Sequence, residues 1–114
     1  MIKNKKFVWN SLGNWNDLNT HVISTSGYSM LKVLFKLEYT SSTYIVREYY
    51  ITISSGNYAE LFVDGFYYDI NNYASWSISY DLSKQSLQIQ SSWLKMVTLG
   101  KSQACKCNVF VYGK

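Results

Sequence analysis

Polar and apolar residues alternate with a period of two along residues 75–90, and this pattern constrains the fold more than any other. The apolar positions would share one face of an extended strand: Trp76, Ile78, Tyr80 and Leu82. The intervening positions are polar: Ser75, Ser77, Ser79 and Asp81. A turn at residues 83–85 leads into a second alternation: Leu87, Gln88, Ile89 and Gln90. Because this period is typical of half-buried strands, the region is predicted to form β-strands.

The dipeptide Asp64-Gly65 lies between two β-prone runs just upstream. Both central residues of a type I′ turn need a positive φ, which glycine adopts freely and aspartate tolerates comparatively well. We therefore expect a tight hairpin in which residues 61–63 pair with residues 66–68.

Two longer stretches also show strand periodicity. In residues 28–40 the alternating apolar positions are Leu31, Val33, Phe35, Leu37 and Tyr39. A helical stripe through Met30, Leu31 and Leu34 competes, but the strand fits more positions and no capping box precedes the run. After a turn at residues 40–43, one face of residues 44–54 carries Ile45, Tyr49, Ile51 and Ile53. Arg47 interrupts this face, so we expect burial from Tyr49 onward.

Shorter elements complete the chain. Further strands are predicted at residues 7–9, 93–99 and 108–112. Residues 12–17 are predicted to be turn, and residues 18–23 fit a helical turn or a short strand. Eight or nine strands with turns every 8–12 residues are typical of sandwiches and barrels. The sequence thus predicts one all-β domain over residues 1–114, an antiparallel jelly-roll-like β-sandwich with residues 1–6 flexible.

The charge distribution argues against a nucleic-acid partner, and the cysteine spacing argues against a disulfide. The net charge is +4, the lysines cluster near the termini, and Arg47 is the single arginine. Nucleic-acid surfaces usually present arginines to phosphates, so we interpret this charge as a solubility feature and expect no nucleic-acid partner. Cys105 and Cys107 are one residue apart, which disfavours a disulfide, and are expected to be reduced thiols.

Motifs for catalysis and metal binding are sparse. His21 is the only histidine, and with two cysteines it does not complete a zinc site within one chain. Asp17 precedes His21 by four residues, a spacing that carries little meaning outside a helix. No nucleophile elbow, phosphate loop or calcium loop is present. We expect a non-enzymatic protein without metal or cofactor and, since no run of 18 apolar residues occurs, without membrane insertion.

Aromatic residues make up 18% of the chain and include 11 tyrosines. Adjacent strand residues point to opposite faces, so one tyrosine of each pair, 49–50 and 67–68, is expected to lie away from the core. Trp76 is assigned to the core, whereas Trp15 lies between two asparagines in a predicted loop. Strand propensity explains any single tyrosine, but together the rings favour a surface that stacks on sugar C–H faces. The candidate binding residues are Trp15, Tyr49, Tyr50, Tyr67, Tyr68 and Tyr73.

Three segments resemble the C-terminal head domains of viral and phage fibres: YITISSGNY (50–58), LFVDGFYYDI (61–70) and SISYDLSKQSLQI (77–89). The likeness lies in Ser-, Asn- and Tyr-rich alternating strands with few charges and no cysteine framework. It implies a sandwich that forms a homotrimer and binds a host-cell receptor or surface glycan. It also implies a place on the virion surface, the alternative being an extracellular protein.

The chain contains no proline. Sandwich proteins often use proline to block pairing at sheet edges, so its absence fits edges covered by copies of the same chain. An AT-rich coding sequence would deplete proline as well. Besides the fibre head, two alternative functions are considered: a monomeric carbohydrate-binding module and a small hydrolase.

Overall fold

In the residues that it describes, the computed structural model is a β-sandwich of eight strands in two four-stranded antiparallel sheets, as predicted. It describes residues 8–17, 19–38, 44–53, 59–69, 72–96 and 107–114, and these contain no helix. Within the strands, backbone alone is described at residues 38, 59–63, 66–69, 72, 91–96 and 107.

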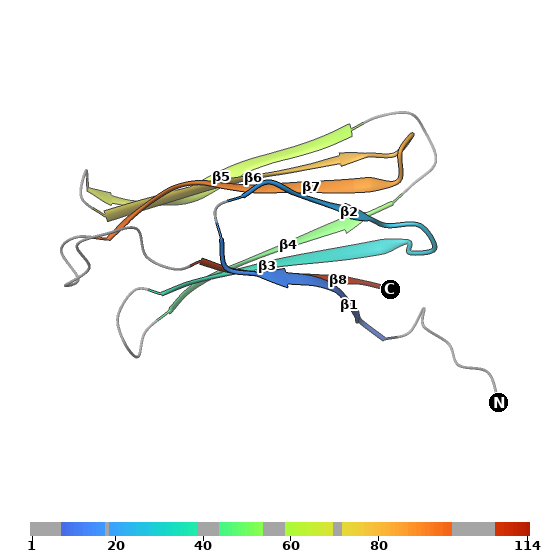
Figure 1. Cartoon of the computed structure of the whole chain (residues 1–114), viewed down its shortest axis with the longest axis horizontal. Coiled ribbons are helices and arrows are strands. Elements are labelled where there is room, and N and C mark those ends of the chain that lie inside the picture. The colour runs from blue at the N-terminus through green and yellow to red at the C-terminus, as the bar shows by residue number, and fades with distance from the viewer. Residues whose placement is uncertain (1–7, 18, 39–43, 54–58, 70–71, 97–106) are drawn as a thin grey trace.

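Each sheet is one layer of the sandwich (Figure 1). Sheet A has the order β1 (Asn10–Trp15), β8 (Cys107–Gly113), β3 (Met30–Glu38) and β4 (Tyr44–Thr52). Sheet B has the order β2 (His21–Ser24), β7 (Ser86–Met96), β6 (Asn72–Asp81) and β5 (Ala59–Asp69). The pairs β1–β8 and β2–β7 nest as in a jelly roll, whereas β3–β4 and β5–β6–β7 are pairings between consecutive strands.

The core lies between the sheets and is built from the residues that alternate in the sequence. Sheet A contributes Leu31, Val33, Phe35, Leu37, Ile51, Val109 and Val111. Sheet B contributes Ala74, Trp76, Ile78, Tyr80, Leu87 and Ile89. The rings of Phe35 and Trp76 stack across the interface with centroids 4.7 Å apart. On β4, Arg47 is exposed and Ile51 is buried, so the predicted interruption is confirmed, but Ile45 on the other side of Arg47 is also half-buried against the core.

The predicted Asp64-Gly65 hairpin is wrong. Both residues lie inside the continuous strand β5, where Asp64 pairs with Trp76 and Gly65 pairs with Ser75. A Cβ atom on Gly65 would lie 2.3 Å from the carbonyl oxygen of Ala74. Glycine is therefore needed here because two backbones approach closely, which is the other common reason for a glycine within a strand.

The N-terminal prediction is also wrong in its boundaries. The first strand spans Asn10–Trp15 and so includes residues 12–15, which were predicted to be turn. Val8 and Trp9, from the predicted strand at residues 7–9, are not in a strand. The register of β1 against β8 shifts between Ser11 and Gly13, which leaves Leu12 as the extra residue of a bulge. Because a shift of one residue reverses the faces of a strand, this bulge decides which residues upstream point inward.

The remaining elements follow the prediction more closely. Residues 21–24 form a strand, the turn after Asp81 is present, and residues 93–96 continue β7 instead of starting a new strand. Residues 1–6, the predicted turn at 40–43, residues 97–99, Cys105 and the side chain of Cys107 lie outside the described part of the structure.

Candidate functional site

Aromatic and lysine side chains share the outer surface of sheet A. Val33 and Phe35 point into the core. Because successive residues of a strand alternate between its faces, Lys32 and Lys36 of β3 lie on the opposite face. The register places Lys32 between Tyr50 of β4 and Tyr112 of β8. We call this surface the aromatic face and define it by Trp9, Lys32, Lys36, Tyr44, Tyr50, Tyr112 and Lys114.

Trp9 lies just before β1 and reaches the aromatic face from the opposite edge of sheet A. Its ring centroid is 6.1 Å from that of Tyr50, although β4 and β1 are the two outermost strands of the sheet. The Asn10 side-chain amide anchors this approach by donating to the carbonyl oxygens of Val8 (3.1 Å) and Gly113 (3.3 Å). Without the bulge at Leu12, Trp9 would have the same parity as the inward-facing Trp15.

The lysines of the aromatic face are seated on its rings. Lys32 Nζ lies 4.9 Å from the ring centroids of both Trp9 and Tyr112, and Lys114 Nζ lies 4.9 Å from that of Trp9. Lys36 Nζ lies 4.3 Å from the ring of Tyr44. Such contacts hold an ammonium group over a ring, because the ring quadrupole attracts a cation. The surface is therefore both aromatic and positively charged.

Tyr50 is the most accessible of the predicted binding residues whose side chains are described. It is 53% exposed, and its hydroxyl donates to Glu48 at 3.1 Å. This hydrogen bond to a carboxylate raises the pKa of Tyr50. The hydroxyl is thus held by Glu48, and the exposed ring remains accessible to a ligand.

Tyr49 points the other way and connects the two sheets, so it is not placed as a ligand-binding residue. Its hydroxyl accepts a hydrogen bond from Trp76 Nε1 at 2.7 Å and donates to the carboxylate of Asp64. Burial, followed by the hydrogen bond to Asp64, raises the pKa of Tyr49 to about 12. The opposite orientations of Tyr49 and Tyr50 confirm the expectation for this pair.

Trp15 was predicted to lie in a loop, and this is wrong. It is the last residue of β1 and packs against the core. Its ring stacks on that of His21, with centroids 4.0 Å apart and planes at 12°. A shallow pocket of about 240 Å³ beside it is lined by Asn14, Trp15, Asn16 and Asn108. The predicted neighbourhood of asparagine amides is therefore present, but His21 covers a face of the ring.

Asp17 and His21 are in contact, although their spacing was given little weight. His21 Nε2 lies 2.7 Å from Asp17 Oδ1, and this hydrogen bond lowers the pKa of Asp17. The pair is brought together because the chain turns between β1 and β2, where the Asp17 carboxylate also accepts from the Asn19 backbone N–H at 2.9 Å. His21 stacks on Trp15, and its hydrogen bond with Asp17 stabilises this turn.

The structure separates the other predicted residues from the aromatic face. Tyr73 is half-buried on β6, at the parity opposite to the core residues Ala74 and Trp76, so it lies on the outer surface of sheet B. The backbone of Tyr67 pairs with that of Tyr73, and the register shifts between Tyr67 and Asp69. The side chains of Tyr67 and Tyr68 are outside the described part of the structure.

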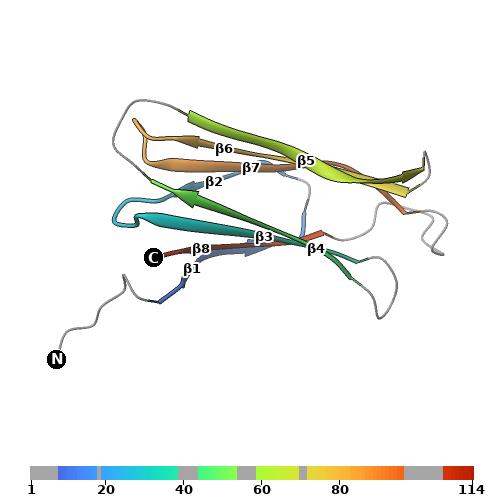
Figure 2. The same cartoon turned by 180° about the vertical axis from the view of Figure 1, so that it is seen from behind.

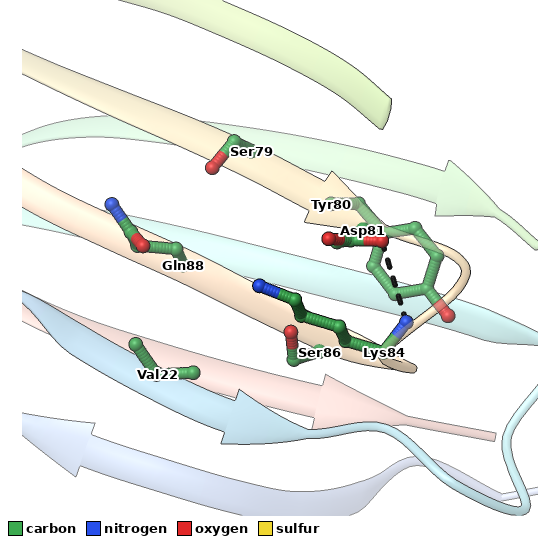
Figure 3. Close-up of a pocket in the computed structure, with 7 residues that line it drawn as sticks. All are labelled: Val22, Ser79, Tyr80, Asp81, Lys84, Ser86 and Gln88. Carbon is green, nitrogen blue, oxygen red and sulfur yellow. Dashed lines mark hydrogen bonds between the residues drawn. The ribbon is translucent and has the colours of Figure 1, made fainter. Parts of the chain in front are cut away.

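A second shallow pocket of about 350 Å³ lies on the outer side of sheet B, beside the β6–β7 turn (Figure 3). It is lined by Val22, Ser79, Tyr80, Asp81, Lys84, Ser86 and Gln88. The Asp81 carboxylate is engaged by the turn itself, since it accepts from the backbone N–H groups of Ser83 (3.0 Å) and Lys84 (3.3 Å). This pocket is polar, and Lys84 is the one cation in its lining.

Parity alone would have placed part of the aromatic face on one surface. Lys32, Lys36 and Tyr50 alternate with core residues in long strands, which is a signal present in the sequence. Trp9 required the bulge, and Lys114 required the pairing of β8 with β3. Within the described residues, no group of three or more acidic, histidine or cysteine side chains is arranged to hold a metal ion. The same residues include no helix that would cross a membrane.

No family model matches the chain, and neither a curated protein nor a solved structure matches it.

Proposed function

We propose that this protein is a non-enzymatic attachment domain of the fibre-head type, which binds a cell-surface glycan through the aromatic face. The observation that carries the proposal is the gathering of Trp9, Tyr50 and Tyr112 with lysines on one outer surface of the sandwich. Aromatic rings present an apolar surface with a negative face, which suits the C–H groups of sugars. A rigid sheet holds these rings in place before the ligand arrives, so little entropy is lost on binding.

The edges of the sandwich support self-association as part of this proposal. Strands β1 and β4 are the edges of sheet A, and β2 and β5 are the edges of sheet B. Seen from behind, β4 and β5 lie in different layers (Figure 2), and the hydrogen bond between Tyr49 and Asp64 places them on the same flank. Long edge strands without proline are open to pairing with another chain. We therefore propose a homotrimer exposed on a virion surface.

A glycan array probed with the labelled protein tests the binding function. We expect selective binding to surface oligosaccharides, weakened about two- to tenfold by Tyr50→Ala, since one aromatic contact contributes about 0.5–1.5 kcal/mol. Tyr73→Ala on the outer surface of sheet B is the matched control and should leave binding unchanged. Absence of oligosaccharide binding, or a loss in Tyr73→Ala alone, would refute the proposed site.

Light scattering at several protein concentrations tests the assembly separately. A mass near three times 13.2 kDa that persists on dilution is the expected result. If the protein is a stable monomer that still binds sugars, the fibre-head proposal is wrong, and the protein is a free carbohydrate-binding module that uses the same face.

A further inference from the structure

Among the residues that the structure describes, the lysines of the aromatic face make no salt bridge, and the Glu48 carboxylate on the same surface accepts instead from the Tyr50 hydroxyl. Lys32 and Lys114 both contact the ring of Trp9, and Lys32 also contacts Tyr112. In the part of the chain that the structure describes, the contact between Asp17 and His21 is the only one with the geometry of a salt bridge. None of the ammonium groups on the aromatic face is therefore paired with a carboxylate there.

Two positive charges lie around the ring of Trp9. Because Lys32 Nζ and Lys114 Nζ each lie 4.9 Å from the same ring centroid, they are no more than about 10 Å apart, close to the Debye length at physiological salt. The negative face of an indole ring attracts each of them but carries no net charge to offset their repulsion. An anionic group beside both lysines would interact favourably with each.

We propose that the glycan bound by the aromatic face is acidic, with a carboxylate or sulfate group at Lys32 and Lys114 and a sugar ring on Tyr50. This inference rests on the proposed function and adds the chemical class of the ligand. Tyr50 suits the stacking role because its ring is exposed, whereas Trp9, Tyr112 and Tyr44 each carry a lysine. Lys36 extends the positive charge along β3, so the ligand can be longer than one sugar.

The face fits an acidic glycan better than a nucleic acid. Phosphate backbones are usually held by arginines, whose planar guanidinium groups make two parallel hydrogen bonds. Arg47 is the single arginine of the chain, it has the core-facing parity of β4, and it donates to the carbonyl oxygen of Val46 at 3.1 Å. Lysines on rings supply point charges, which suit the separated acidic groups of a polysaccharide.

Two pairs of polysaccharides that differ in charge test the inference: polygalacturonate with its methyl ester, and dextran sulfate with dextran. Binding is measured by intrinsic tryptophan fluorescence and by calorimetry, at low and at physiological ionic strength. We expect the full-length protein to bind an acidic member roughly tenfold or more tightly than its neutral counterpart, with an affinity that falls as salt is added. Equal affinity for both members of each pair would overturn the inference and leave the proposed function in place.

Lysine variants locate the charge contact. Lys32→Gln and Lys114→Gln should each weaken binding of the acidic polysaccharide about two- to fivefold, as expected for exposed ion pairs. Lys84→Gln removes the same charge from the outer surface of sheet B and should have no effect. An equal loss in Lys84→Gln would show that net charge, not this face, is responsible, and would overturn the inference.

Oligothymidylate serves as the competing ligand. If the protein binds this single strand more tightly than both acidic polysaccharides, and Lys32→Gln loses that binding, the ligand of the aromatic face is a nucleic acid and the inference of an acidic glycan is wrong. If no polysaccharide binds, acidic or neutral, the proposed function itself fails.

Discussion

The hydroxyl of Tyr49 links the two sheets, and Tyr49→Phe tests how much this link stabilises the sandwich. The substitution removes the acceptor of the Trp76 indole N–H but keeps the phenyl ring, whose edge contacts Phe35 with centroids 5.8 Å apart. Trp76 is 2% exposed, so its N–H does not readily gain water as a substitute partner. Asp64 is exposed and regains water when it loses the phenol.

The cost should come mainly from the indole N–H. Leaving one buried donor without an acceptor costs about 1–3 kcal/mol, so the free energy of unfolding should fall by about 2 kcal/mol. In a domain of this size that corresponds to a decrease of roughly 5–10 °C in Tm. Urea and thermal unfolding followed by circular dichroism give both quantities. Tyr50→Phe is the matched control, because its hydroxyl bonds Glu48 at the surface, and it should change stability by less than about 0.5 kcal/mol.

The same hydroxyl predicts a loss of stability in alkaline solution. The pKa of Tyr49 is raised to about 12, whereas an unfolded tyrosine ionises near pH 10. Stability from this group is therefore complete below about pH 10 and is lost as the pH rises toward about 12. The full difference would be about 2.7 kcal/mol, which solvent screening of a half-exposed side chain reduces to about 1 kcal/mol. Tyr49→Phe should lack this component; equal stabilities of Tyr49→Phe and Tyr50→Phe at every pH would refute the reasoning.

Two further predictions concern Gly65 and Asp17. Gly65→Ala should lower the free energy of unfolding in urea by about 2–4 kcal/mol, because the added Cβ would meet the β6 backbone. Ser77→Ala, on the same strand pair, is the control and should have little effect. An unchanged stability of Gly65→Ala would show that β5 and β6 do not approach so closely. The hydrogen bond from His21 lowers the pKa of Asp17, so its stabilising contribution is present above the unfolded value near 3.8 and is lost as the pH falls through the lower folded value. An NMR titration should place the Asp17 midpoint below 3.8 and should move it upward in His21→Ala; an unmoved midpoint would assign the shift to the Asn19 backbone instead.

Local periodicity predicted the strands that build the core. Trp76 and Ile78 alternate with polar residues, as does Phe35 apart from its neighbour Leu34, and an extended chain has no other way to bury one set while exposing the other. The same rule correctly separated Tyr49 from Tyr50. These features depend on neighbours within a strand, so the sequence alone contains the information.

Local turn chemistry was misleading where long-range pairing competed with it. Asp64-Gly65 has the composition of a hairpin turn, but β5 forms more backbone hydrogen bonds by pairing along its length with β6 than a two-residue turn would allow. Gly65 then serves close packing of backbones, a role that depends on a strand beginning seven residues later.

Alternation placed Lys32, Lys36 and Tyr50 on one surface, but only the tertiary structure completed the aromatic face. Lys32 and Lys114 are far apart in the sequence and meet on Trp9 because β8 returns to pair with β3. A single extra residue in β1 turns Trp9 outward, and no local pattern marks that residue. The sequence thus determined which residues are buried in the long strands, by their alternation. Strand pairing and one bulge, which depend on contacts between distant segments, decided which rings and charges share a surface.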